Sequence, residues 1–278
     1  MSTRQWKARD VAKCIIIPSD LDNKYSRGVL GIITGSARFP GAAVLTCASA
    51  SATGLGMIRF HSNSGLAHLV LHTNPEVVVQ PGPVNAWLAG SGIESNRYSD
   101  FTTWLRHRWF TLISKQSVPT ILDAGALSLA GKFTHPTLIT PHAGELARLL
   151  NSRGMEVTSE AIEGDPKKWA VKASEFLGVV VLLKGSRTVV ADGESLIELT
   201  ISSPWLATAG SGDVLAGIVA ALAATNYVEI LNDRKRLSEV AASAAYIHNS
   251  AALLASRDAP ISAPRIIDFI PDAIRKIL

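Results

Sequence analysis

The chain has 278 residues, of which 47% are hydrophobic and 18% are charged. This length and apolar content suffice for a buried core in one large α/β domain or two small ones, and they exclude a disordered chain. The formal net charge is only +4, and the basic residues are scattered along the sequence. We therefore expect no nucleic-acid partner, because such proteins concentrate lysine and arginine on one face. A weakly basic protein instead favours anionic small molecules.

The cysteines and the apolar segments indicate the compartment. Cys14 and Cys47 both lie inside apolar stretches, which is typical of reduced thiols in a core rather than of a disulfide framework. The first residues are mixed in character and do not form a cleavable apolar run. The longest apolar stretch, residues 214–224, is too short to span a bilayer. We expect a cytoplasmic protein with no membrane contact.

The predicted elements alternate along the chain. Short β-branched runs predict strands at residues 29–34, 69–72, 77–79, 120–123, 137–139, 179–183, 188–191 and 196–201. Helices are predicted between them, at residues 40–53, 98–115, 144–151, 166–177, 213–224 and 237–256. Most strand runs are continuously apolar, which suits a largely parallel sheet with helices on both sides, whereas a turn joins the last two strands as a hairpin. We expect an α/β fold with a single domain, residues 24–278, after an N-terminal segment, 1–23.

Ligands of such sheets bind beyond the carboxyl ends of the strands, on loops that lead into helices. The first such loop leads through Pro40 and Gly41 into a helix of very small residues that includes Ala42. This helix permits the close approach of either a flat ligand or a neighbouring element. A later turn places Gly82 between two prolines, where the backbone could lie against a ligand.

The loop after the predicted strand 137–139 carries a histidine. Pro141 fixes the turn, and His142 stands close to the end of the strand. A lone histidine is more often a structural or surface residue, but its place on a strand-to-helix loop favours ligand contact. Glu145 stands in the first turn of the helix, where an acid complements the helix dipole.

A second polar loop follows the predicted strand 179–183. It begins with a lysine and a glycine and continues to a hydroxyl side chain, which suits the phosphates of a nucleotide. The alternative is an ordinary turn into the hairpin. The residues of this loop are Lys184, Gly185, Ser186, Arg187 and Thr188.

The most specific signal is a turn of small residues that opens an apolar helix. Gly210, Ser211 and Gly212 let backbone N–H groups approach an anion, and the helix adds its positive N-terminal dipole. The turn is not a P-loop, and Leu215 replaces the third glycine of the dinucleotide fingerprint. Asp213 either caps the helix or serves as a base toward a bound group.

The sequence has no metal-ligand spacing and no Gly-x-Ser-x-Gly elbow after a strand. We therefore expect neither a metal site built from protein side chains nor a serine hydrolase. These absences leave the glycine turn and the polar loops as the places for chemistry.

Taken together, the loops resemble the NAD(P)H-hydrate dehydratase family, a branch of the ribokinase-like superfamily. The resemblance covers residues from about 24 to about 254. It rests on Pro-Gly-Ala-Ala at 40–43, Asp-Ala…Ala-Leu at 123–127, Thr-Pro-His-x-x-Glu-x-x-Arg-Leu at 140–149, Lys-Gly…Thr at 184–188 and Gly-Ser-Gly-Asp-Val-Leu-Ala-Gly at 210–217. It implies a ribokinase-like fold and an enzyme that restores NADH or NADPH from the hydrated form. ADP or ATP would phosphorylate the ring hydroxyl, and loss of phosphate would restore the double bond.

The resemblance also implies residue roles. Asp213 would be the general base, while the amides at 210–212 and Mg²⁺ would stabilise charge on the transferring group. Contact with the hydrated dinucleotide is implied for Ala42, Gly82, His142 and Asp213. Binding of the adenine nucleotide is implied for Lys184, Gly185, Ser186, Arg187, Thr188 and Gly212. Because relatives form homo-oligomers and many carry an epimerase domain, we expect a homo-oligomer and a separate epimerase protein acting on the same metabolite.

Two departures from the family pattern leave alternatives open. Gln80 stands where relatives usually have glycine, which weakens the expected contact at Gly82, and Gly125 replaces a common acidic residue. The main alternative is a kinase of the same superfamily acting on a vitamin-precursor alcohol, since it would use the same Asp213. A nucleotide-binding regulatory protein without turnover is a third possibility, against which a carboxylate beside an anion site argues.

Overall fold

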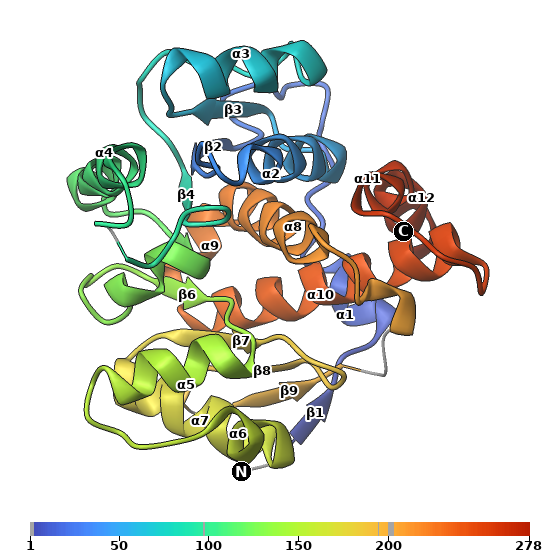
Figure 1. The fold of residues 1–278 in the computed structure, drawn as a ribbon. Coiled ribbons are helices and arrows are strands. Elements are labelled where there is room, and N and C mark those ends of the chain that lie inside the picture. The colour runs from blue at the N-terminus through green and yellow to red at the C-terminus, as the bar shows by residue number, and fades with distance from the viewer. Residues whose placement is uncertain (1–2, 97, 194, 200–202) are drawn as a thin grey trace.

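A nine-stranded sheet forms the centre of the part of the chain that the computed structural model describes, residues 3–96, 98–193, 195–199 and 203–278. The strand order is β1-β9-β8-β7-β6-β5-β4-β2-β3, and Figure 1 shows the sheet running from β3 at the top to β1 at the bottom. The strands from β3 to β7 pair in parallel, β8 is antiparallel to both of its neighbours, and β1 pairs in parallel with β9. The strands are β1 (Thr3–Gln5), β2 (Val29–Ile33), β3 (Met57–Phe60), β4 (Ala86–Ala89), β5 (Thr120–Leu122), β6 (Thr137–Ile139), β7 (Val180–Leu183), β8 (Val189–Ala191) and β9 (Leu196–Glu198).

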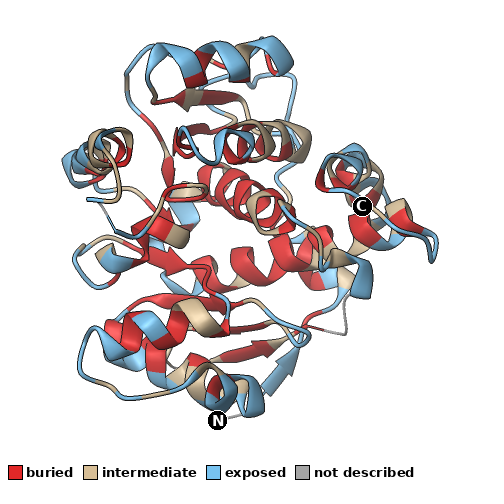
Figure 2. Ribbon diagram, viewed as in Figure 1, coloured by how far each residue is buried: buried red, intermediate tan, exposed pale blue. Residues whose placement is uncertain are grey.

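Helices cover both faces of the sheet because successive side chains of the strands point to opposite faces. In β2, Leu30 and Ile32 join a core with α2, α8 and α10, while Val29 and Ile33 join a core with α5 and α7. Figure 2 shows α8 and α10 almost entirely buried and the outer side of α3 exposed. Within the described residues, no helix combines the length and apolarity needed to cross a membrane. The helices are α1 (Ala8–Ala12), α2 (Pro40–Thr53), α3 (Ser64–Thr73), α4 (Phe101–Trp109), α5 (Ala143–Asn151), α6 (Ser159–Gly164), α7 (Pro166–Leu177), α8 (Ser211–Thr225), α9 (Tyr227–Asn232), α10 (Lys235–Ser256), α11 (Ala263–Asp268) and α12 (Ile270–Ile277), with 3-10 helices η1 (Phe110–Lys115), η2 (Ala124–Leu129) and η3 (Pro204–Leu206).

The small residues of α2 let it pack closely against α8. A Cβ added at Gly217 of α8 would lie 2.0 Å from Ser49 Oγ and 2.6 Å from the Thr46 carbonyl oxygen. The sequence left open whether the small residues of α2 admit a flat ligand or a neighbouring element. Along this part of α2 they admit a neighbouring element, α8. The first turn of the helix, around Ala42, lies at the carboxyl edge of the sheet.

Several sequence-based expectations for the elements were wrong. Residues 69–72 lie in α3, where Leu66, Ala67 and Val70 are buried at helical spacing and the Asn63 side chain accepts from the Leu66 amide. Residues 77–79 make only an isolated bridge, between Val78 and Arg59. The helix expected at 98–115 is α4 followed by a 3-10 turn, and the last expected strand extends partly onto residues 200–201, which lie outside the described part. The short strands β1, β3 and β4 were not predicted.

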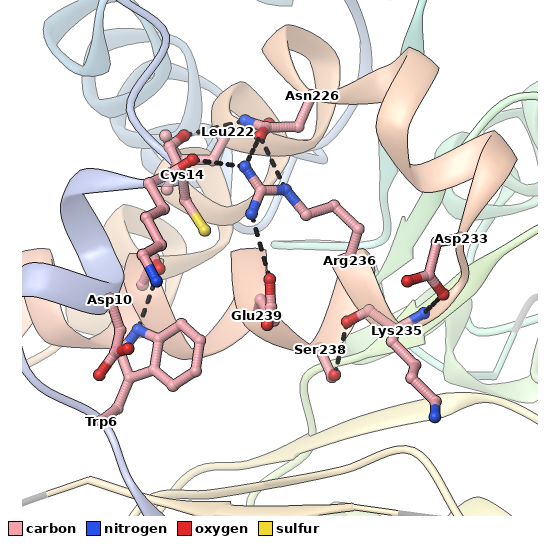
Figure 3. A network of polar contacts seen from close by, with 12 residues as sticks. Trp6, Asp10, Cys14, Leu222, Asn226, Asp233, Lys235, Arg236, Ser238 and Glu239 are labelled. Carbon is pink, nitrogen blue, oxygen red and sulfur yellow. Dashed lines mark hydrogen bonds and ion pairs between the residues drawn. The ribbon is translucent and has the colours of Figure 1, made fainter.

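The first described residues pack onto α10 (Figure 3). The indole of Trp6 is buried and donates to Ser243 Oγ at 3.0 Å. The Asn226 side chain donates to the Cys14 carbonyl oxygen at 2.9 Å and accepts from Arg236. Cys14 and Cys47 are both buried and unbridged, as expected. The segment before residue 24 thus extends the sheet through β1 and closes one end of the core.

Candidate active site

Four polar side chains follow four neighbouring strands and join in one network. Asp123 follows β5 and accepts from Ser91 Oγ, beyond β4, at 2.8 Å and from Thr140 Oγ1, after β6, at 2.8 Å. Lys184, after β7, brings its Nζ to 3.0 Å from Asp123 Oδ1. Because these strands are parallel, their carboxyl ends meet at one edge, where ligands of such sheets bind. Each residue stands directly after a short apolar run or close to its end, yet only the fold shows that the four meet.

The network holds two opposite charges away from water. Burial opposes the ionised form of Asp123, but the Lys184 ammonium and the Thr140 and Ser91 hydroxyls outweigh it, so the pKa of Asp123 lies below its ordinary value. Burial also opposes the charge on Lys184, but Asp123 and Glu145, whose Oε2 lies 3.7 Å from Nζ, raise the pKa of Lys184. The site therefore keeps a fixed ammonium beside a carboxylate at neutral pH.

The glycine turn lies opposite this ammonium. Gly210 has a φ of +85°, and a Cβ added there would meet Leu45 at 2.5 Å and Ala263 at 3.0 Å, so only glycine fits. A Cβ added at Gly212 would lie 3.6 Å from Lys184 Nζ. The start of α8 has no side-chain cap. The Ser211 amide donates to the Thr208 carbonyl oxygen at 3.3 Å, and the amides that follow it in the first turn are the ones placed for an anion.

Asp213 lies in the first turn of α8, above the network. Burial and the nearby charge of Asp123 raise the pKa of Asp213 to about 7, although Lys184 opposes the shift. A carboxyl group with this pKa exchanges its proton at physiological pH, as a general base requires. The cap proposed as an alternative role is not formed, because Gly210 occupies the cap position.

His142 caps α5. Its Nδ1 accepts from the Gly144 amide at 3.1 Å and more weakly from the Glu145 amide, while a Glu145 carboxylate oxygen accepts from the His142 amide at 2.9 Å. The Lys184 amide donates to the Pro141 carbonyl oxygen at 2.8 Å, so the histidine loop and the lysine loop lie side by side. The His142 side chain remains 55% exposed. Its Nε2 lies 3.6 Å from Glu145 Oε2, and the residue borders the pocket described next.

A pocket of about 750 Å³ opens between the lysine loop, the glycine turn and α10. On α10 it is bounded by His248 and Asn249. Burial lowers the pKa of His248 to about 4, so its ring is neutral at pH 7, and its Nε2 lies 3.3 Å from Ser211 Oγ. His248 and Asn249 were not predicted, because nothing in a helical alanine-rich segment marks them. Seven predicted residues line this pocket: His142, Lys184, Gly185, Ser186, Thr188, Ser211 and Gly212. Arg187 borders an adjoining hollow of about 400 Å³.

Gly82 does not join the other predicted residues. A Cβ added at Gly82 would lie 2.6 Å from the Arg59 guanidinium carbon. Three residues later the Asn85 amide donates to the Val29 carbonyl oxygen, at the amino-terminal end of β2. The glycine that does approach Ala42 is Gly92, where an added Cβ would lie 2.4 Å from Ala42 Cβ. It was missed because β4, the strand just before it, was not predicted.

A buried arginine fixes the loop before α2. Arg106 of α4 is 2% exposed and donates to the carbonyl oxygens of Thr34, Gly35 and His61. Three fixed carbonyl acceptors satisfy the guanidinium and hold the ends of β2 and β3 together. The loop that leads to Ala42 is thereby held rigid at the edge of the site.

The glycine turn, a fixed ammonium and a titratable carboxyl group thus lie together at one edge of the sheet. A family model described as NAD(P)H-hydrate dehydratase matches residues 30–272 of the chain. The chain belongs to the NAD(P)H-hydrate dehydratase family. The family assignment agrees with the motifs around His142 and Asp213.

Two relatives and one solved structure show how far the similarity extends. The bifunctional NAD(P)H-hydrate repair enzyme Nnr of Mycobacterium tuberculosis is 38% identical over 236 residues, covering 79% of this chain and 46% of the relative. The chain thus spans about half the length of such bifunctional relatives. The ADP-dependent (S)-NAD(P)H-hydrate dehydratase of Neisseria meningitidis serogroup B is 29% identical over 271 residues, covering 91% of this chain and 86% of the relative.

The structural comparison concerns the fold. The crystal structure of the ADP/ATP-dependent NAD(P)H-hydrate dehydratase from Bacillus subtilis, co-crystallised with ATP and Mg²⁺, matches 100% of both chains with a TM-score of 0.85 and 22% sequence identity. The expected ribokinase-like α/β fold, with a largely parallel sheet between two layers of helices, is confirmed.

Proposed function

We propose that this chain dehydrates the hydrated form of NADH or NADPH with ADP, or ATP, as co-substrate. The observation that carries the proposal is Asp213, with a pKa of about 7, in the uncapped first turn of α8 and close to the Lys184 ammonium. A pure nucleotide-binding protein has no need for a carboxyl group that titrates beside its anion site, because the negative charge competes with the phosphate. A base for a hydroxyl group explains it.

The reaction begins with proton transfer. Asp213 accepts the proton of the ring hydroxyl as the hydroxyl oxygen attacks the terminal phosphorus of the nucleotide. An oxygen–phosphorus bond forms, the bond to the leaving phosphate oxygen breaks, and AMP, or ADP when ATP is used, departs. The phosphorylated carbon then loses inorganic phosphate and its neighbouring carbon loses a proton, which restores the ring double bond.

The residues around Asp213 divide between the two ligands. Lys184, Gly185, Ser186, Arg187, Thr188 and Gly212 would hold the nucleotide, whose base and sugar the 750 Å³ pocket accommodates. The amides of Gly210, Ser211 and Gly212 would form the anion hole for the transferring phosphate. Ala42, His142 and Asp213 would contact the hydrated dinucleotide, and the positions of the two glycines favour Gly92 over Gly82 for the remaining contact.

Magnesium belongs with the nucleotide in this proposal. Within the described residues no three His, Cys, Asp or Glu side chains converge to hold a metal ion. Mg²⁺ is often bound through substrate phosphates and few protein ligands. It would neutralise charge on the phosphates next to Lys184, and no step requires a protein-built metal site.

The proposal is tested by incubating the purified protein with hydrated NADH, Mg²⁺ and either ADP or ATP. We expect the absorbance of reduced nicotinamide to recover, with one phosphate and one AMP or ADP released for each ring restored. No recovery with either nucleotide, in protein that unfolds cooperatively, would refute the dehydratase function. Phosphorylation of a hydroxymethylpyrimidine or thiazole alcohol by the same protein would instead support the kinase alternative.

A further inference from the structure

Asp123 is the most deeply buried carboxyl group at the site, and the proposed reaction gives it no role. It is 3% exposed, and both of its carboxylate oxygens are occupied by Ser91, Thr140 and Lys184. It is absent from the residues that line the 750 Å³ pocket, whereas Lys184 lines it. Any effect of Asp123 on a bound nucleotide therefore passes through Lys184.

The hydrogen bonds to Asp123 fix where its charge lies. The Asp123 amide donates to the Ala89 carbonyl oxygen and the Thr140 amide to the Leu122 carbonyl oxygen, which extends the sheet pairing beyond the strands. Two short hydroxyl bonds then hold the carboxylate from either side. A buried ion pair with its remaining oxygens satisfied by fixed donors is held in one geometry. The ammonium of Lys184 is consequently held opposite Gly212.

We propose that Asp123 is a positioning residue, which holds the Lys184 ammonium at the glycine turn, next to the first turn of α8 that carries Asp213. The inference deepens the proposed function, because it assigns the part of the site that prepares Asp213 for its role. Asp123 itself touches neither ligand.

The charges that face Asp213 and its turn come from three elements. The sheet contributes Asp123 and Lys184, which act on the proton of Asp213 in opposite directions. From α5 come Glu145, which approaches Lys184, and His142. From α10 comes His248, whose ring is neutral at pH 7. The elements α2 and α11 meet the turn through Leu45 and Ala263. Removing either charge on the sheet should therefore move the titration of Asp213 in a direction fixed by its sign.

A carbon-13 NMR titration of the aspartate carboxyl groups in the ligand-free protein tests this. The Asp213 signal is assigned by its loss in Asp213→Asn. We expect Asp123→Asn, which is isosteric and can keep the hydroxyl bonds, to lower the pKa of Asp213 by about one unit or more, a tenfold change in proton affinity. Lys184→Met should move it upward. Ser91→Ala is the matched control, because it removes one hydrogen bond and keeps both charges, and should leave the pKa within about 0.3 units.

Each outcome decides the inference. An unchanged or raised pKa of Asp213 in folded Asp123→Asn would overturn it. If Asp123→Asn does not fold, Lys184→Met decides the question. A pKa of Asp213 that does not rise in Lys184→Met would also overturn the inference, because the Lys184 ammonium would then not be held beside Asp213. Kinetics separates this inference from the proposed function. The acidic limb of the pH profile of kcat/KM should follow the NMR pKa in each variant. An NMR shift with an unmoved limb would confirm the positioning role of Asp123 and reject Asp213 as the base.

Discussion

The two ends of strands β6 and β7 both border a hollow, but only one of the hollows is equipped for chemistry. At the carboxyl end the hollow measures about 750 Å³, and at the amino end, around Thr137 and Val180, about 370 Å³. A helix begins at each. At the amino end the Asp233 carboxylate accepts from the Lys235 amide, the first of α10, at 3.0 Å. The start of α8 at the carboxyl end has no such cap. The two ends thus differ in the side chain beside the helix start. A carboxylate accepts from the first amide of α10, whereas the Lys184 ammonium faces the glycine turn of α8, and only the second arrangement suits an anion.

The largest expected effect is on kcat, and it follows from removing the carboxyl group beside the glycine turn. Asp213→Asn keeps the size of the side chain and the glycine turn but removes the base, so kcat should fall about 100-fold or more. Nucleotide affinity should remain, since the amides and Lys184 are unchanged and a competing negative charge is gone. Steady-state kinetics and calorimetric titration of the nucleotide measure the two quantities. Retained turnover in this variant would show that Asp213 is not the base.

The next largest effect is on nucleotide affinity. A lysine lies near each end of strands β6 and β7, Lys184 at the carboxyl end and Lys235 at the amino end, so the two can be compared. Lys184→Met removes the buried ammonium at the carboxyl end, and a charge-assisted hydrogen bond of about 1.5–3 kcal/mol corresponds to roughly a 10- to 100-fold rise in the Kd for ADP. Lys235→Met is the matched change at the amino end and should leave the Kd unchanged. Equal losses in the two variants would mean that general positive charge, not this site, binds the nucleotide.

A smaller effect concerns the stability of Asp213→Asn, which should rise although its activity falls. The pKa of Asp213 is raised to about 7 in the folded protein, so the stability it contributes is fully present below its unfolded pKa of about 3.9 and is lost as the pH rises through 7. At pH 8 the wild-type protein folds against a buried negative charge that Asp213→Asn lacks. We expect the variant to be more stable by about 1 kcal/mol at pH 8, and by less at pH 5. Thermal unfolding at the two pH values measures this, and a variant less stable at pH 8 would contradict the shifted pKa.

Local sequence patterns were enough to locate the loops of this site, because each follows a short apolar strand and enters a helix. His142, Lys184 and Asp213 were therefore predicted on loops that the structure brings to one edge of the sheet, and the sheet and its two helix layers were expected. Contacts between distant strands were not legible. The bond from Ser91 to Asp123 depends on β4 lying between β2 and β5. The residues of β4, Ala-Trp-Leu-Ala, include no β-branched side chain, so the pattern that predicted other strands does not mark it. The same missed strand explains why Gly92, which lies against Ala42, was not among the predicted residues.

The smallest expected effect comes from removing the side-chain acceptor at the start of α10, which lies at the amino end of these strands. Asp233→Ala removes the side-chain acceptor of the Lys235 amide, and loss of such a hydrogen bond costs about 1 kcal/mol, or roughly 2–4 °C in Tm. The hollow there would then have a helix start without a side-chain acceptor, like that of α8, but the residues that open this helix, Asp233, Arg234 and Lys235, include no glycine. We therefore expect lower stability with no new nucleotide binding and no change in kcat/KM. Asp233→Asn keeps an acceptor and should restore most of the Tm. If Asp233→Ala gained a measurable phosphate site, the uncapped helix start alone would suffice for binding, and the Asp123–Lys184 pair would be needed only for the chemistry.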